Sequence, residues 1–146
     1  MPTMARLVAA ICLLLVGAAA TQSIALNLPD PLPAKYLFPV NLLVSAVVGW
    51  ITIGKRLGRG VIPSLNWGLT AGVGLVFWAL LAHAVGRMWI LAFRESYKTP
   101  PDAILGVFEE FMKYAVYLQD FSVIGILVMG SALAGVIAEF VNRRFP

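Results

Sequence analysis

The chain has 146 residues, of which 60% are hydrophobic and 12% are charged, and its mean hydropathy is +0.88. Soluble domains carry about 25% charged residues, so this composition leaves too little polar surface to cover a water-soluble globule. It excludes a soluble enzyme and predicts a single all-α membrane domain over residues 1–146. The net charge of +4 is therefore interpreted through its distribution over the loops, and not as a nucleic-acid signal.

The first apolar run covers residues 7–27 and follows Arg6. Its length matches the roughly 20 residues that a bilayer core requires, which predicts a transmembrane helix. A cleavable signal peptide over residues 1–20 is the alternative, because Ala18-Ala19-Ala20 is typical of a cleavage site. The helix is favoured because apolar residues continue to Leu26. Cys12 lies in this run and is interpreted as a packing residue. Prolines then predict an extended loop at Pro29, Pro31 and Pro33.

Two further runs predict transmembrane helices over residues 37–54 and 67–93. In the first of them we expect Pro39 in the opening turn, where its missing N–H costs little. Asn41 is the one strongly polar side chain of that run, and we expect it to make an interhelical hydrogen bond.

Residues 101–118 predict an amphipathic helix, introduced by Thr99-Pro100-Pro101-Asp102 as a helix start. Charges at every turn argue against a membrane crossing, so this helix is expected at the interface or docked on the bundle. Its polar face is expected to carry Asp102, Gly106, Glu109, Glu110, Lys113 and Tyr117.

The last run covers residues 121–141 and predicts the fourth transmembrane helix. Small residues recur along it at four-residue spacing, namely Gly130, Ser131, Ala134, Gly135 and Ala138. Because small residues permit close helix approach in lipid, we expect this helix at the bundle centre, against Gly68 and Gly72 of the third run.

The distribution of basic residues predicts the orientation. With four spans, both termini and the middle loop share one side, which carries Arg6, Lys55, Arg56, Arg59, Arg143 and Arg144. The other side carries Lys35, Arg94, Lys98 and Lys113, with Arg87 at its border, and six of the seven acids. Short loops rich in Lys and Arg stay in the cytoplasm, so both termini and residues 55–66 are predicted to be cytoplasmic.

Glu139 is the acidic residue inside a predicted span, which makes it a candidate functional residue. Its position one turn before Arg143 favours a structural ion pair instead, with Arg143 or with Lys55 or Arg56 of the middle loop.

The middle loop itself carries Lys55, Arg56 and Arg59. These charges could attract anionic lipid head groups, and the backbone N–H groups beside Gly58 and Gly60 could hold an oxyanion. Determination of topology explains the same charges and is the favoured interpretation.

His83 and Arg87 form a second candidate pair, one helical turn apart. They could bind an anion or relay a proton, because histidine titrates near neutral pH. The favoured interpretation is an interfacial pair, in which the arginine extends to water.

Several short stretches are spread over nearly the whole chain. They are Met1-Pro2-Thr3 with Ala5-Arg6-Leu7-Val8-Ala9-Ala10, Gly49-Trp50 with Gly54, Arg56 and Gly58-Arg59-Gly60, Pro101 with Ala103 and Val107-Phe108, and Gly135-Val136-Ile137-Ala138-Glu139 with Arg143-Arg144. In this order and spacing they resemble the TrgA family of small bacterial membrane proteins, which is named for an association with tellurite resistance. The resemblance implies a bacterial inner-membrane protein of this size and implies no catalytic, cofactor-binding or metal-binding residue.

The favoured function is therefore a non-enzymatic membrane protein that contributes to tolerance of toxic oxyanions, with no cofactor. An enzyme is disfavoured because the sequence has no cluster of His, Cys, Asp and Glu at catalytic spacing. The alternatives are a small exporter or transport subunit, or an assembly partner of another membrane protein. Expected partners are the lipid bilayer and, through small-residue helix faces, a second copy or another membrane protein, with no nucleic acid.

Overall fold

The computed structural model describes residues 3–27, 34–93 and 99–145, and these segments are helical with short connections and no strand. The expected proline-rich loop, residues 94–98 and the side chains of Lys35 and Tyr117 lie outside the described part. The elements are α1 (Thr3–Asn27), α2 (Ala34–Val48), the π-helix η1 (Gly49–Ile53), α3 (Val61–Phe93), α4 (Pro100–Val116), the 3₁₀-helix η2 (Tyr117–Gln119) and α5 (Phe121–Arg144).

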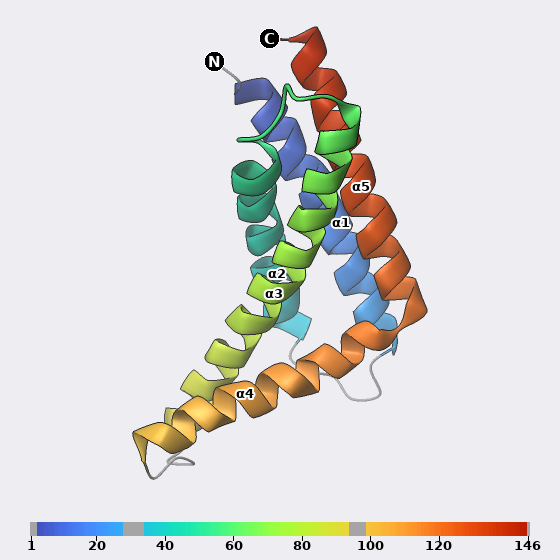
Figure 1. The fold of residues 1–146 in the computed structure, drawn as a ribbon. Coiled ribbons are helices and arrows are strands. Elements are labelled where there is room, and N and C mark those ends of the chain that lie inside the picture. The colour runs from blue at the N-terminus through green and yellow to red at the C-terminus, as the bar shows by residue number, and fades with distance from the viewer. Residues whose placement is uncertain (1–2, 28–33, 94–98, 146) are drawn as a thin grey trace.

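Four of the helices run up and down beside one another, and α4 crosses the far end of this bundle (Figure 1). Both termini and the loop between η1 and α3 lie at the opposite end, which we call the basic end because it carries Arg6, Lys55, Arg56, Arg59, Arg143 and Arg144. α5 makes its most extensive contacts with α1 and α3. The last helix therefore packs against α1 and α3, as the small-residue spacing indicates, while α2 packs against the same two helices, so no single helix occupies the centre.

Within the described residues, three helices are long and apolar enough to cross a membrane, which supports an integral membrane protein. They are Met4–Leu26, Val61–Phe93 and Phe121–Arg144. The fourth expected span is represented by the apolar helix Leu37–Ile53, which is shorter than these three. The amphipathic helix is present as α4.

Two expectations about helix boundaries are wrong. α3 begins at Val61, six residues earlier than expected, so Pro63 lies in its first turn, where a missing N–H leaves no helical partner unsatisfied. The start is fixed at Ser64, whose backbone N–H donates to the Gly60 carbonyl at 3.1 Å. α2 begins at Ala34, so Pro39 lies inside the helix and not in its opening turn. The helix tolerates it there at the loss of one backbone hydrogen bond.

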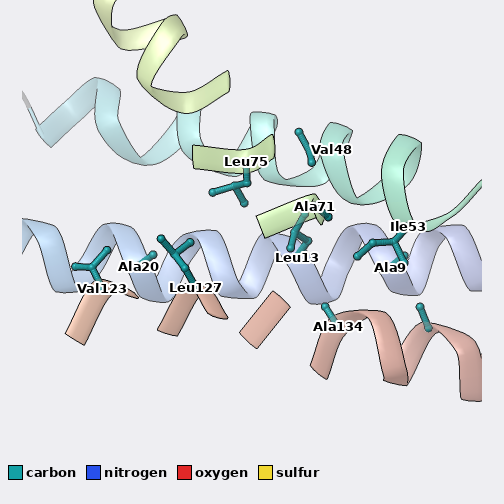
Figure 2. Packing of buried hydrophobic residues seen from close by; sticks show 11 residues of the cluster. Ala9, Leu13, Ala20, Val48, Ile53, Ala71, Leu75, Val123, Leu127 and Ala134 are labelled. Atoms are coloured by element: carbon teal, nitrogen blue, oxygen red, sulfur yellow. The ribbon is translucent and has the colours of Figure 1, made fainter. Parts of the chain in front are cut away.

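The bundle core is built from small and medium apolar side chains (Figure 2). Ala9 and Leu13 of α1, Ala71 of α3 and Val123 of α5 are each 0% exposed. Cleavage after residue 20 would remove Ala9 and Leu13 from this core. In the structure α1 is thus an integral part of the packed bundle.

A close helix crossing joins α3 and α5 at Gly68 and Gly135. A Cβ atom built on Gly68 would overlap the Ser131 carbonyl oxygen, and one built on Gly135 would overlap the Ser64 carbonyl oxygen. Gly72 is similarly close, since its Cβ would lie 2.6 Å from Ser131 Oγ. The expectation that the two small-residue faces meet is confirmed, and both faces are used within the chain.

α4 presents three surfaces around its axis. The surface against α3 includes Phe111, whose ring centroid lies 6.2 Å from that of Phe77, and the buried Gly106. Gly106 is buried although helical spacing places it between Asp102 and Glu110 on the polar face, so this face is partly covered; glycine tolerates this because it has no polar side chain that needs water. A second surface carries exposed charges, among them Glu109. The third is apolar and between 59% and 66% exposed, comprising Ile104, Leu105, Phe108, Met112 and Val116.

Candidate functional site

The loop at the basic end, residues 54–60, is shaped by glycines. Gly54 closes η1 by donating its N–H to the Gly49 carbonyl at 3.1 Å, and Arg6 Nε donates to the Gly54 carbonyl at 3.3 Å. Gly58 and Gly60 have φ angles of 89° and 112°, in the left-handed region that side chains disfavour. These two turns place the N–H groups of both glycines toward α5.

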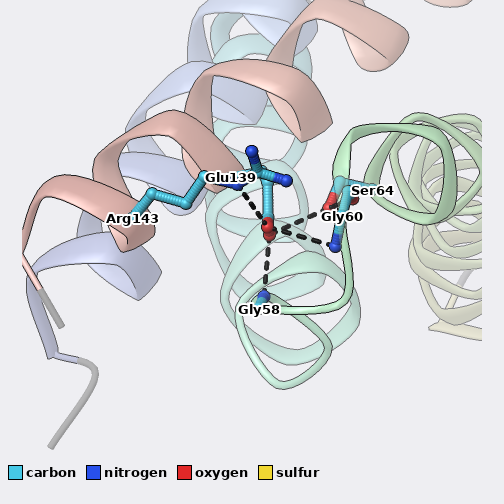
Figure 3. A network of polar contacts seen from close by, with 5 residues as sticks. All are labelled: Gly58, Gly60, Ser64, Glu139 and Arg143. Carbon is cyan, nitrogen blue, oxygen red and sulfur yellow. Dashed lines mark hydrogen bonds and ion pairs between the residues drawn. The ribbon is translucent and has the colours of Figure 1, made fainter.

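The carboxylate of Glu139 accepts hydrogen bonds from those two N–H groups (Figure 3). Its Oε2 accepts from Gly58 N at 2.7 Å, and its Oε1 accepts from Gly60 N at 3.2 Å. Arg143 Nε donates to Oε1 at 3.2 Å. The Ser64 hydroxyl lies 3.0 Å from Oε2 and 2.8 Å from the Gly60 carbonyl oxygen, so its single proton serves one of these two acceptors at a time. We call these five residues the Glu139 network.

Burial explains why so many donors converge on one carboxylate. Glu139 is 1% exposed, and a buried charge is tolerated only when hydrogen bonds replace its hydration. Arg143 is more than half exposed, so its charge is screened by solvent and contributes less than the loop donors do. The network therefore fastens the loop to α5 mainly through backbone hydrogen bonds.

This geometry shows which of the contacts expected for Glu139 and the loop glycines are formed. The structural pair of Glu139 with Arg143 is confirmed, whereas Lys55 and Arg56 form no ion pair with Glu139. The N–H groups considered for an oxyanion are already occupied by the chain's own carboxylate. An external oxyanion would have to displace Glu139 to reach them.

The three loop cations, Lys55, Arg56 and Arg59, are exposed. The guanidinium carbon of Arg56 lies 3.5 Å from the ring centroid of Trp67, which holds the side chain at the start of α3. Neither Lys55 nor Arg59 forms an ion pair within the described part of the chain.

A second polar cluster lies nearer the α4 end, and His83 belongs to it. His83 Nε2 lies 2.8 Å from Asn41 Oδ1, Asn41 Nδ2 donates to Thr21 Oγ1 at 2.9 Å, and Thr21 Oγ1 donates to the Gly17 carbonyl at 2.6 Å. Because Oδ1 can only accept, Nε2 carries the proton in this arrangement. The cluster links α1, α2 and α3, which confirms the expected interhelical role of Asn41.

His83 does not pair with Arg87 in the structure. Its ring lies instead against Tyr114 of α4, with centroids 5.8 Å apart. Both rings line a small cavity of about 60 Å³, whose walls are mainly apolar. Arg87 makes no hydrogen bond or ion pair within the described residues, so the structure does not bring the favoured pair together and shows no contact for the alternative anion or proton site.

The sequence did not single out Thr21, which belongs to the cluster of Asn41 and His83, or Ser64, which belongs to the Glu139 network. A polar residue inside an apolar run was the available signal for Thr21. The role of Ser64 could not be recognised, because the hydropathy pattern places residues 61–66 outside the third helix.

Replacement of Asn41 by Ala should lower the free energy of unfolding by about 1–2 kcal/mol, because it leaves Thr21 and His83 without their shared partner. Thermal unfolding of the purified protein in detergent measures this. Asn66→Ala removes an exposed amide of the same type and should leave the melting temperature unchanged. Equal melting temperatures for Asn41→Ala and wild type would contradict the bridging role.

A comparison of the chain with models of known families, with curated proteins and with solved structures finds no match. Function therefore has to be inferred from the residues and their geometry.

Proposed function

We propose that the chain is a non-enzymatic inner-membrane protein of the TrgA type that contributes to resistance to tellurite. The observation that carries this proposal is the Glu139 network. Two stretches of the family resemblance, Gly58-Arg59-Gly60 and Glu139 with Arg143, are about 80 residues apart in sequence and form one hydrogen-bonded unit. Because these two stretches both resemble the TrgA family and contact each other, we infer that the contact is a structural feature that the chain shares with that family.

The proposed topology has four membrane crossings, with both termini and the basic loop in the cytoplasm. It is supported by the arrangement in Figure 1, where the two termini and the loop share one end of the bundle. The segment Leu37–Ile53 would supply the crossing between α1 and α3. Its 17 residues extend roughly 25 Å, so this crossing needs either a local thinning of the bilayer or neighbouring helices to shield its ends.

A structural role for the buried polar groups supports a function without catalysis. Glu139, His83 and Asn41 each form hydrogen bonds with other segments of the same chain. We propose that the protein acts by limiting oxyanion uptake, assisting export or protecting the envelope. The exporter alternative is weaker, because Glu139, the acid inside a predicted span, is committed to the loop.

The packing of α3 against α5 limits the surfaces through which a partner protein could bind. A second copy or another membrane protein would have to use faces other than the small-residue faces of α3 and α5, since Gly68 and Gly135 already face each other. The exposed apolar surface of α4 is compatible with contact to lipid at the membrane interface.

A clean deletion of the gene tests the tellurite proposal. The deletion strain should be more sensitive to tellurite than its parent, and expression of the wild-type chain should restore resistance. Selenite, arsenite and a membrane-active detergent serve as comparison stresses, which separate an oxyanion effect from general envelope weakness. Unchanged tellurite sensitivity of the deletion strain would refute the proposed function.

A further inference from the structure

An apolar groove of about 590 Å³ lies between α2 and α3 on the outside of the bundle. This volume falls within the roughly 300–1,000 Å³ typical of ligand sites. One side of the groove extends from Leu43 of α2 to Thr52 of η1, and the α3 side extends from Trp78 to Val85. Its lining is almost entirely hydrocarbon, and it is open along one side, so its occupant must present apolar surface.

Three contacts fix where the groove lies along the bundle. Asn41 and His83 join α2 to α3 toward the α4 end, and Val48 approaches Gly74 midway. At the basic end Arg56 stacks on Trp67. On the side of α2 and η1 the groove lining ends at Ile51 and Thr52, one turn before Lys55 and Arg56, whereas its α3 side lies level with the Asn41–His83 contact.

The length of the groove matches one leaflet of a bilayer. From Leu43 to Thr52 the helix rises about 13 Å, close to half of a hydrocarbon core of roughly 30 Å. A molecule with its polar group at Lys55 could therefore extend an apolar chain to about the bilayer midplane.

Lys55 and Arg56 follow the η1 end of the groove, which we call its mouth, and they are available to an anion. Lys55 and Arg56 are exposed and form no ion pair within the described part of the chain. Stacking on Trp67 uses the face of the Arg56 guanidinium and leaves its edge N–H donors free to bind a phosphate. The nearby carboxylate, Glu139, is buried and already bound to the loop.

We propose that this site binds one anionic glycerophospholipid, with its phosphate on Lys55 and Arg56 and an acyl chain in the groove between α2 and α3. The charge at the mouth selects an anionic head group, and the apolar groove selects a chain of membrane length. The inference rests on the proposed topology, in which the basic loop lies at the cytoplasmic membrane surface.

Native mass spectrometry of the purified full-length protein in detergent tests the site. The probes are long-chain phosphatidylglycerol, phosphatidylcholine with the same chains, short-chain phosphatidylglycerol and inorganic phosphate. Long-chain phosphatidylglycerol should bind at least 10-fold more tightly than phosphatidylcholine. The double variant Lys55→Gln/Arg56→Gln should lose about 30-fold in affinity for it, as expected for two basic residues near a membrane surface. Arg144→Gln, at the same end but on α5, should lose much less.

The groove is tested separately by Ala82→Phe, which fills it from α3. This variant should weaken binding of the long-chain lipid at least 10-fold and leave the short-chain lipid unaffected. Ala132→Phe on α5, half-buried but outside the groove, is the matched control and should change neither. Circular dichroism of each variant establishes that it is folded.

Three results would overturn the proposal: equal binding of the two long-chain lipids, an equal loss with Arg144→Gln, or no effect of Ala82→Phe. Inorganic phosphate binding as tightly as the lipid would assign the cations to a free anion and would also overturn it. These binding measurements are independent of the deletion phenotype, so failure of one leaves the other standing.

Discussion

Replacing Glu139 by Gln should destabilise the protein by about 3 kcal/mol and lower its amount in the membrane. The amide keeps one acceptor oxygen, but its NH2 group takes the place of the other oxygen and faces the backbone N–H of either Gly58 or Gly60. Buried donors would then face each other without an acceptor, and the loop should detach from α5. Chemical or thermal unfolding in detergent and quantitative immunoblotting of membranes measure the two effects.

Two controls separate this effect from loss of charge. Glu109→Gln removes an exposed carboxylate on α4 and should leave stability unchanged. Arg143→Gln removes the exposed partner of the ion pair and should cost less than about 1 kcal/mol, because solvent screens that pair. A Glu139→Gln protein that is stable and abundant but fails to restore tellurite resistance would contradict the structural role and favour a functional carboxylate.

The second large effect is expected at the crossing of α3 and α5. Gly135→Ala should destabilise the protein by about 2 kcal/mol or more, because the added Cβ overlaps the backbone carbonyl of Ser64. A change of side-chain rotamer cannot relieve a clash with backbone, so the two helices must separate. That movement would also loosen the Glu139 network, since Ser64 belongs to both contacts.

Glycines on the same two helices provide matched controls. A Cβ atom at Gly86 of α3 or at Gly125 of α5 would meet nothing within 4 Å. Gly86→Ala and Gly125→Ala should therefore be neutral or slightly stabilising, since alanine favours a helix over glycine. A melting temperature of Gly135→Ala equal to that of Gly125→Ala would show that the close crossing does not hold the bundle together.

Local sequence patterns predicted most of the helices and the charge distribution. Apolar runs marked all four bundle helices, and the spacing of Glu139 and Arg143 predicted their ion pair, because both features depend on residues near one another in the chain. The small-residue faces of α3 and α5 were recognisable for the same reason.

Contacts between distant segments were harder to predict. Nothing in the local pattern indicates that Glu139 accepts hydrogen bonds from Gly58 and Gly60, since the bonds depend on two left-handed turns and on the crossing of α3 and α5. His83 was paired with Arg87 because they are one turn apart, yet its partner is Asn41 on another helix. Hydropathy also could not decide whether Leu37–Ile53 crosses the membrane, because its length is near the minimum for a span.

Cysteine labelling across the membrane tests the four-crossing topology most directly. Single cysteines replace the exposed residues Met4, Arg59 and Asp102 in a Cys12→Ser background, and an impermeant thiol reagent is applied to spheroplasts and to inverted vesicles. The account predicts labelling of Met4→Cys and Arg59→Cys only in inverted vesicles, and of Asp102→Cys only in spheroplasts. Labelling of Met4→Cys together with Asp102→Cys in spheroplasts would show three crossings and contradict the account.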